Sequence, residues 1–211
     1  MAGYKGRRST GGTGGSGASF KPGALHYHAF LGHPMGTASM TGVALATNFA
    51  GRLLALPDIA GEAVEVDRLA VLVSTALALS GGRVALYDDN GSFYPGALLC
   101  ESSELSSTST GWKESTVSQA LTRGQRFWRV LWWAVGGSLR GHSAGDHRTL
   151  LGHAGAAAAA PADPIQALEK VSAYVVGVSS FGASHPTFPA GAALTEGRTG
   201  IPHIFTRHSI P

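Results

Sequence analysis

The feature that most constrains this chain is a repeated alternation of short apolar runs with turn residues. Eight runs of six to twelve residues follow one another from residue 51 onward. Runs of that length, bounded by Gly, Pro, Asn and Ser, indicate β-strands rather than helices. The expected strands cover residues 51–56, 64–75, 83–89, 97–103, 112–121, 126–135, 172–180 and 201–210.

The connections between these runs carry residues that suit tight turns. Pro57 closes the first run, and Asp89-Asn90-Gly91 supplies residues that tolerate a positive φ. Short strands with short connections are typical of an antiparallel β-sandwich. The sequence therefore predicts an all-β fold, an antiparallel β-sandwich of the jelly-roll type.

Both faces of the run 126–133 carry apolar side chains. One face holds Phe127, Arg129, Leu131 and Trp133, and the other holds Arg126, Trp128, Val130 and Trp132. We expect such a strand to be buried on both sides or to lie at a subunit contact.

Two segments depart from the strand pattern. Residues 1–47 are predicted as an extended, Gly-rich N-terminal arm, and residues 48–211 as the sandwich domain. Within the sandwich, an Ala-rich insertion at about residues 136–170 is expected to be an irregular loop. Near its end, Asp163, Pro164 and Gln166 signal a short helical turn.

The arm is predicted to be an anchor. A tract rich in Gly, Ser and Thr is flexible in isolation, and ordering it costs roughly 1–2 kcal/mol per residue. Its small polar side chains do not offset that cost by burial, so we expect another protein to hold it. The anchoring contacts are assigned to Tyr4, Lys5, Arg7, Arg8 and Phe20.

Composition argues against several classes of function. The single cysteine, Cys100, rules out an intrachain disulfide and a four-cysteine zinc site. A formal net charge of +3 is too small to make nucleic acid the expected partner. The chain has no run of 18 apolar residues and no apolar signal-peptide core, so membrane insertion is not expected.

Residues 141–145 match G-x-S-x-G, the nucleophile elbow of α/β-hydrolases. The elbow needs a strand ending at the first glycine and a helix after the serine. Here the expected strand ends near Val135, five residues intervene, and two glycines follow Ser143. We therefore expect a loop, no catalytic residues and no enzyme, and a hydrolase using Ser143 is the less favoured alternative.

Metal and cofactor sites are not predicted. His26, His28 and His33 lack a carboxylate partner, so surface or subunit-contact positions are favoured over metal ligation. Asp88, Asp89 and Asn90 lack the spacing of a calcium loop and are interpreted as a hairpin turn.

Two connections carry side chains suited to recognition, which loops on a rigid scaffold commonly perform. In the first, Asp88 and Asp89 offer carboxylates to sugar hydroxyls, and Phe93 and Tyr94 offer rings for stacking. In the insertion, the basic residues suited to an acidic polysaccharide are Arg140, His142, His147 and Arg148. The alternative, that both connections pack against neighbouring subunits, is equally open.

A set of strand and turn motifs in residues 66–134 has a known counterpart. The motifs are Val66-Asp67-Arg68-Leu69, Arg83–Asp88, an Asn-Gly turn, Pro95–Leu99, a Ser/Thr-rich hairpin ending in Gly111, and an aromatic strand. Together with the proline-rich end at 181–210, they resemble a domain of fibre, spike and receptor-binding proteins in tailed bacteriophages and phage-like particles. These motifs carry no catalytic residue, and the Ala-rich insertion departs from the pattern.

The resemblance implies a virion structural protein of the fibre or spike type, assembled in the host cytoplasm. The arm would join it to other virion proteins, and the sandwich would face outward for attachment, with a host-surface polysaccharide as the expected ligand. A homotrimer is the favoured oligomer. The alternative is a capsid decoration protein that stabilises the shell and binds no ligand.

Overall fold

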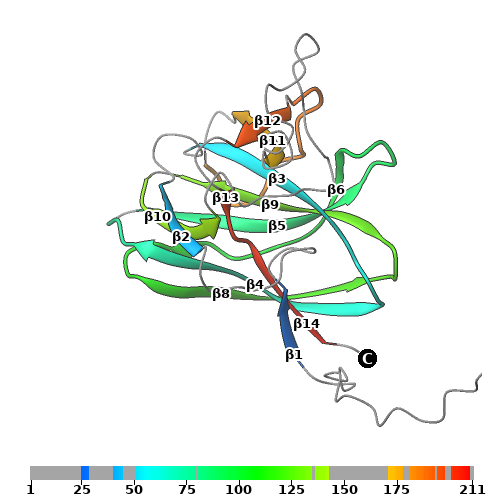
Figure 1. The fold of residues 1–211 in the computed structure, drawn as a ribbon, viewed down its shortest axis with the longest axis horizontal. Coiled ribbons are helices and arrows are strands. Elements are labelled where there is room, and N and C mark those ends of the chain that lie inside the picture. Colours follow the sequence, from blue (N-terminus) through cyan, green and yellow to red (C-terminus); the bar gives the residue numbers. More distant parts are fainter. Residues whose placement is uncertain are drawn as a thin grey trace, which may run out of the picture.

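The computed structural model describes residues 25–28, 40–44, 51–78, 80–134, 136–142, 171–177, 181–192, 194–197 and 201–209. These residues form two seven-stranded sheets, and every strand pairing is antiparallel. The sheets pack face to face as two layers (Figure 1), and the described residues contain no helix. The prediction of an all-β antiparallel sandwich is confirmed.

The first sheet, sheet A, is built around the long strand β4 (Val64–Thr75). On one side β4 pairs with β8 (Gly111–Leu121), and on the other side it pairs with β14 (Phe205–Ser209) and β10 (Ser138–His142). The remaining strands of sheet A are β1 (Leu25–His28), β2 (Met40–Ala44) and β13 (Ile201–Pro202).

The second sheet, sheet B, is centred on β9 (Arg126–Trp133). This strand pairs without a register shift with β3 (Arg52–Ile59) on one side and β5 (Gly81–Asp89) on the other. Beyond them lie β6 (Pro95–Glu101), β7 (Leu105–Ser106), β11 (Val171–Gly177) and β12 (Leu194–Gly197).

All eight expected strands are present, the last one divided into β13 and β14. Several boundaries differ by about two residues: β5 begins at Gly81, and β6 runs from Pro95 to Glu101. In the first strand, Pro57 does not close the run, because β3 continues to Ile59. The pairing of β3 with β11 ends at Ala55, so Pro57 lies beyond that paired stretch, where a missing N–H is tolerated. The strands that the sequence did not predict are β1, β2, β7, β10 and β12.

Three of these strands lie in segments where the sequence predicted no strand. Strands β1 and β2 pair with β14 and β10, so sheet A takes in two stretches of the segment predicted as an arm. Strand β10 lies inside the predicted loop insertion, and its Leu139 is fully buried in the core. The prediction of an irregular loop from residue 136 is therefore wrong at its start. Residues 143–170, including the expected helical turn, lie outside the described residues.

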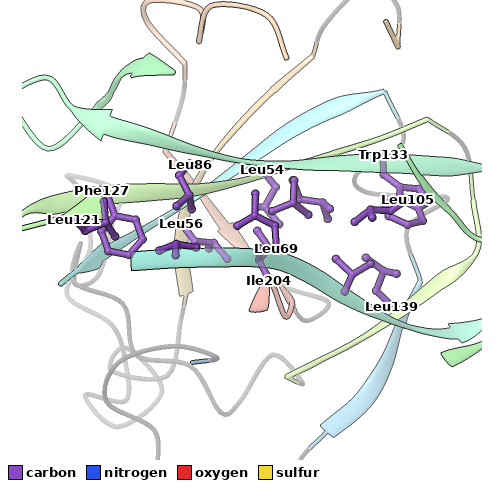
Figure 2. Close-up of a cluster of buried hydrophobic side chains, with 14 of the residues drawn as sticks. Leu54, Leu56, Leu69, Leu86, Leu105, Leu121, Phe127, Trp133, Leu139 and Ile204 are labelled. Atoms are coloured by element: carbon purple, nitrogen blue, oxygen red, sulfur yellow. The ribbon is translucent and has the colours of Figure 1, made fainter. Parts of the chain in front are cut away.

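The main core fills the space between the two sheets. Figure 2 shows Leu54, Leu56 and Leu86 from sheet B in this core, together with Leu69 and Ile204 from the sheet A side. Each is at most 2% exposed. Burying one such side chain is worth about 1.5–3 kcal/mol, so this layer is the principal source of stability.

A buried ion pair joins two neighbouring strands of sheet B. Arg129 of β9 and Asp58 of β3 form a salt bridge although both are nearly inaccessible to solvent. Arg129 Nη1 also donates to the carbonyl oxygen of Ile204, 2.9 Å away. The guanidinium therefore ties sheet B to the chain leading into β14.

The outer face of sheet B is buried as well. It is covered by residues 181–192, which we call the strap, and Phe188 of the strap packs into the apolar cluster on this face. Members of that cluster from the sheet are Leu53, Ala55, Ala85, Tyr87, Trp128, Val130 and Trp132. Burial of β9 on both sides is therefore confirmed, and the chain itself supplies both covers.

Candidate ligand-binding surface at the β5–β6 turn

The turn between β5 and β6 is held by its own side chains. Asp89 Oδ1 accepts a hydrogen bond from the Gly91 amide at 2.9 Å, and Asn90 Oδ1 accepts one from the Ser92 amide at 2.8 Å. The Asn90 amide donates to the carbonyl oxygen of Tyr94 at 2.9 Å. Asx contacts of this kind fix the backbone of short turns, so the turn is a defined structure.

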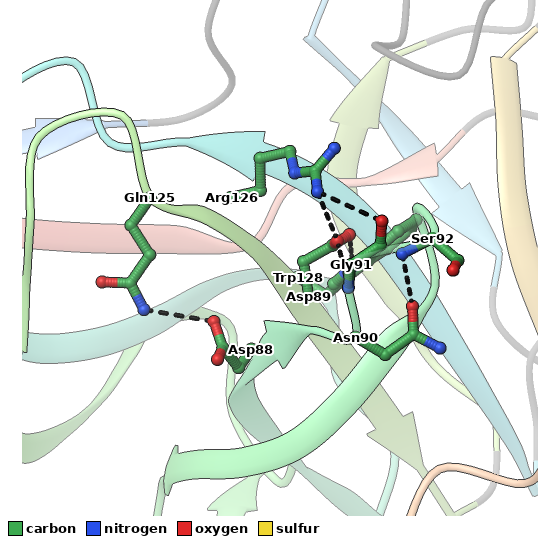
Figure 3. A network of polar contacts seen from close by, with 8 residues as sticks. All are labelled: Asp88, Asp89, Asn90, Gly91, Ser92, Gln125, Arg126 and Trp128. Atoms are coloured by element: carbon green, nitrogen blue, oxygen red, sulfur yellow. Dashed lines mark hydrogen bonds and ion pairs between the residues drawn. The ribbon is translucent and has the colours of Figure 1, made fainter.

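Asp89 is the structural centre of this turn. Its carboxylate forms a 3.1 Å ion pair with Arg126 and accepts a 3.1 Å hydrogen bond from the indole N–H of Trp128 (Figure 3). Its side chain is only 5% exposed. The carboxylate predicted to bind sugar hydroxyls is thus occupied by partners within the chain.

Phe93 projects from the turn and is 42% exposed. The Arg126 guanidinium carbon lies 4.4 Å from the centroid of its ring, a cation–π arrangement. Arg126 therefore has three restraints: the Phe93 ring, the Asp89 carboxylate and the carbonyl oxygen of Gly91, which accepts a hydrogen bond from Arg126 Nη2 at 3.5 Å. Ring and guanidinium together form an exposed surface, which we call the Phe93 platform.

The backbone of Phe93 is strained. Its φ is 55°, and among the described residues it is the one non-glycine residue with a positive φ. That conformation costs a bulky L-residue about 1–2 kcal/mol, which glycine would avoid. The fold thus places a large apolar side chain where it is costly and little buried, a combination found at binding sites.

Tyr94, predicted as a second stacking ring, faces the strap instead. Its hydroxyl donates to the carbonyl oxygen of Pro189 and accepts from the Ala192 amide at 2.7 Å. Its ring packs edge-on against Tyr174 and Phe188. Tyr94 fixes the turn to the body of the molecule, and Phe93 is left as the ring that faces solvent.

Asp88 lies on the other side of β5 from Asp89. Figure 3 shows its carboxylate directed to Gln125, whose amide nitrogen is 3.2 Å from Asp88 Oδ1. The two carboxylates therefore do not converge, as oxygen ligands of calcium must. Across the described part of the chain, no three His, Cys, Asp or Glu side chains gather in a metal-binding group.

The second predicted recognition site is only partly described. Arg140 lies exposed on β10 in sheet A, so the structure places it in a different sheet from the Phe93 turn. Arg148 and His147, the anchoring residues Tyr4, Lys5, Arg7, Arg8 and Phe20, and His33 lie outside the described residues. Their predicted roles stay predictions.

The G-x-S-x-G motif has a different surrounding from the one expected. Strand β10 contains Gly141 and His142, so a strand runs directly into the motif, and the predicted five-residue gap is wrong. However, β10 pairs antiparallel with β2, β4 and β13. A nucleophile elbow lies at the end of a strand in an α/β sheet that is flanked by helices. The described residues of this chain form strands and no helix. Ser143 itself lies outside the described residues.

Arg126 is a site residue that the sequence did not predict. Its position beside Asp89 follows from the pairing of β5 with β9, which are separated in the chain by β6, β7 and β8. No local pattern signals that pairing. The sequence offered only a weak signal for a shared site: Arg126 stands at the start of one apolar run, and Phe93 follows the end of another.

Compared with models of protein families, with curated proteins and with solved structures, the chain matches none. A search of the described residues for a helix long and apolar enough to cross a membrane finds none.

Proposed function

We propose that this chain is a structural attachment protein of a phage-type particle, in which the sandwich presents the Phe93 platform to a host-surface polysaccharide. The observation that carries the proposal is Phe93 itself, an exposed ring kept in a strained backbone conformation. Neither burial nor backbone preference explains a phenylalanine at this position. Contact with an outside ligand does.

The ligand class follows from the chemistry of the platform. An aromatic ring stacks on the C–H face of a sugar, and a neighbouring guanidinium donates hydrogen bonds to its hydroxyls. Arg126 keeps about a third of its side chain exposed, while Asp89 balances its charge. A platform of this kind favours neutral sugar rings over strongly anionic groups.

The particle context rests on the resemblance of residues 66–134 and on the arm. The jelly-roll order of strands, the trimer and the location in a virion belong to this proposal. In this view, residues 1–24 insert into a neighbouring virion protein. A decoration protein would share the arm and the sandwich but would have no ligand at Phe93.

The binding part of the proposal is tested with purified chain on an array of bacterial surface polysaccharides. We expect the wild type to bind, and Phe93→Gly to bind at least about tenfold more weakly, equivalent to about 1.4 kcal/mol. The matched control is Leu77→Ala, which truncates another exposed apolar side chain, 39% exposed, away from the turn. Equal binding by wild type and Phe93→Gly would remove the platform from the function.

The anchoring part is tested separately by deleting residues 1–24. We expect the truncated chain to keep the β-sheet circular dichroism of the full chain but to be missing from purified particles. Incorporation at normal occupancy, measured by quantitative mass spectrometry of the particles, would contradict the anchor. Because this readout is independent of ligand binding, it separates the two parts of the proposal.

A further inference from the structure

The strap is held to sheet B mainly by side chains that bond its main chain. Tyr87 donates to the carbonyl oxygen of Pro186 at 2.5 Å, and Arg83 Nε donates to that of Gly182 at 3.3 Å. Glu101 accepts from the His185 amide at 2.6 Å. With the Tyr94 contacts already described, the strap depends on a few individual side chains rather than on a strand ladder.

His185 belongs to the strap, and its titratable side chain is buried between the strap and sheet B. It is 5% exposed, and its ring lies edge-on to Tyr87 and Trp132, with centroids 6.0 and 5.7 Å apart. Neither of its ring nitrogens makes a well-formed hydrogen bond with the described residues. A neutral imidazole fits this apolar contact, whereas an imidazolium would bury a charge there.

The groups that face His185 come from three strands. Arg83 and Tyr87 face it from β5, Glu101 from β6 and the uncharged Trp132 from β9. The positive charge of Arg83 would repel a protonated His185. Burial raises the pKa of Tyr87 well above its usual value, so the Tyr87 hydroxyl remains protonated and stays a hydrogen-bond donor. Glu101 is the one carboxylate in this set, and it is engaged by the His185 amide.

We propose that the strap is an acid-released cover of the outer face of sheet B, and that protonation of His185 is the releasing event. Release breaks the contacts of Phe181 and Phe188 with the sheet and uncovers its aromatic side chains, Tyr87 and Trp132 among them. The core between the two sheets does not include the strap, so it stays folded.

The direction of the effect follows from the titration of His185. Burial lowers the pKa of His185 from its ordinary value of 6.5 to about 4, the Arg83 main chain opposing the shift and the Arg83 charge adding to it. The open strap therefore binds the proton more tightly than the closed one. The equilibrium constant for closing the strap therefore has its full value above about pH 6.5. It falls by on the order of a hundredfold as the pH decreases to 4.

The test is amide hydrogen exchange of the full chain from pH 7 to pH 4, corrected for intrinsic rates. We expect protection of the His185 and Ala192 amides to fall about a hundredfold, while amides of the β4–β8 ladder change by less than about threefold. His185→Gln should leave strap protection nearly independent of pH. Glu101→Gln, the matched control, should keep most of the pH dependence.

Three results would overturn the inference. The first is loss of protection in the strap and the β4–β8 ladder together, because that is global acid unfolding. The second is release of the strap at an unchanged pH in His185→Gln. The third is loss of the pH dependence in Glu101→Gln, because the Glu101 carboxylate would then be the sensor. If His185→Gln does not fold, NMR of the wild type decides, since the titration of the His185 ring protons must coincide with loss of strap protection.

Discussion

Phe93 and Arg129 show how single residues in this fold are placed against their ordinary preferences. Phe93 is apolar and exposed, in a backbone conformation suited to glycine. Arg129 is charged and buried, and it is paired with Asp58. The strain at Phe93 is offset within the chain only by its cation–π contact with Arg126, and its ring points outward. The charge of Arg129 is balanced within the core by Asp58.

Replacing Phe93 with glycine should change the free energy of unfolding by less than about 1 kcal/mol. The variant relieves the left-handed strain, about 1–2 kcal/mol. Against that, it loses the cation–π contact with Arg126 and makes the unfolded chain more flexible, each about 0.5–1 kcal/mol. Urea unfolding checks this. A loss of more than about 2 kcal/mol would show that Phe93 is structural and would weaken the binding proposal.

Removing Asp58 should be among the most damaging single changes. Asp58→Ala leaves the Arg129 guanidinium buried without its counter-charge, which costs about 3–5 kcal/mol. Asp67→Ala is the matched control, because it removes a more exposed ion pair, with Arg207, worth about 0–1 kcal/mol. Denaturant unfolding of both variants measures the difference. Similar losses in the two would contradict the buried role assigned to Asp58.

Among the elements, β5 and β9 define the geometry of the site and are tightly packed together. Gly82 of β5 lies against Trp133, and a Cβ atom there would fall 2.1 Å from the Trp133 ring and 2.6 Å from the Trp132 carbonyl oxygen. Backbone this close cannot move without breaking the ladder. Glycine at this position is thus a condition for the pairing that brings Arg126 to Asp89.

Gly82→Ala should therefore destabilise the protein by about 1–3 kcal/mol or more, the usual range for overpacking. Gly61→Ala is the control, because nothing lies within 4 Å of a Cβ built there. Thermal unfolding compares the two variants. An unchanged melting temperature for Gly82→Ala would mean that β5 and β9 are less closely packed than the structure shows.

Elements with a strong local pattern were predictable, and those that depend on distant partners were not. The limits 64–75 of β4 and the two faces of β9 were predicted correctly. Strand β10 was missed because its sequence, SLRGH, holds one large apolar residue, Leu139, and gains its burial from the pairing with β4. The strap was also missed, since its prolines and glycines give no sign of the aromatic face that it covers.

In the molecule as a whole, the chain forms a sandwich in which the strap covers the outer face of sheet B. The turn with the Phe93 platform lies where that cover and β5–β6 meet, because Tyr94 bonds the strap while Phe93 faces outward. Of the predicted site, the turn and Phe93 were within reach of sequence analysis. The internal roles of Asp89 and Tyr94 were not, because both depend on partners far away in the chain.

We propose the β5–β6 turn as the surface that meets the ligand. The most direct measurement is an NMR chemical-shift map of the labelled chain during titration with a polysaccharide fragment that it binds. We expect the largest shifts at residues 89–94 and at Arg126, and none of comparable size around Trp112, an exposed aromatic residue of sheet A. A saturable footprint elsewhere, with the β5–β6 turn unperturbed, would contradict the account.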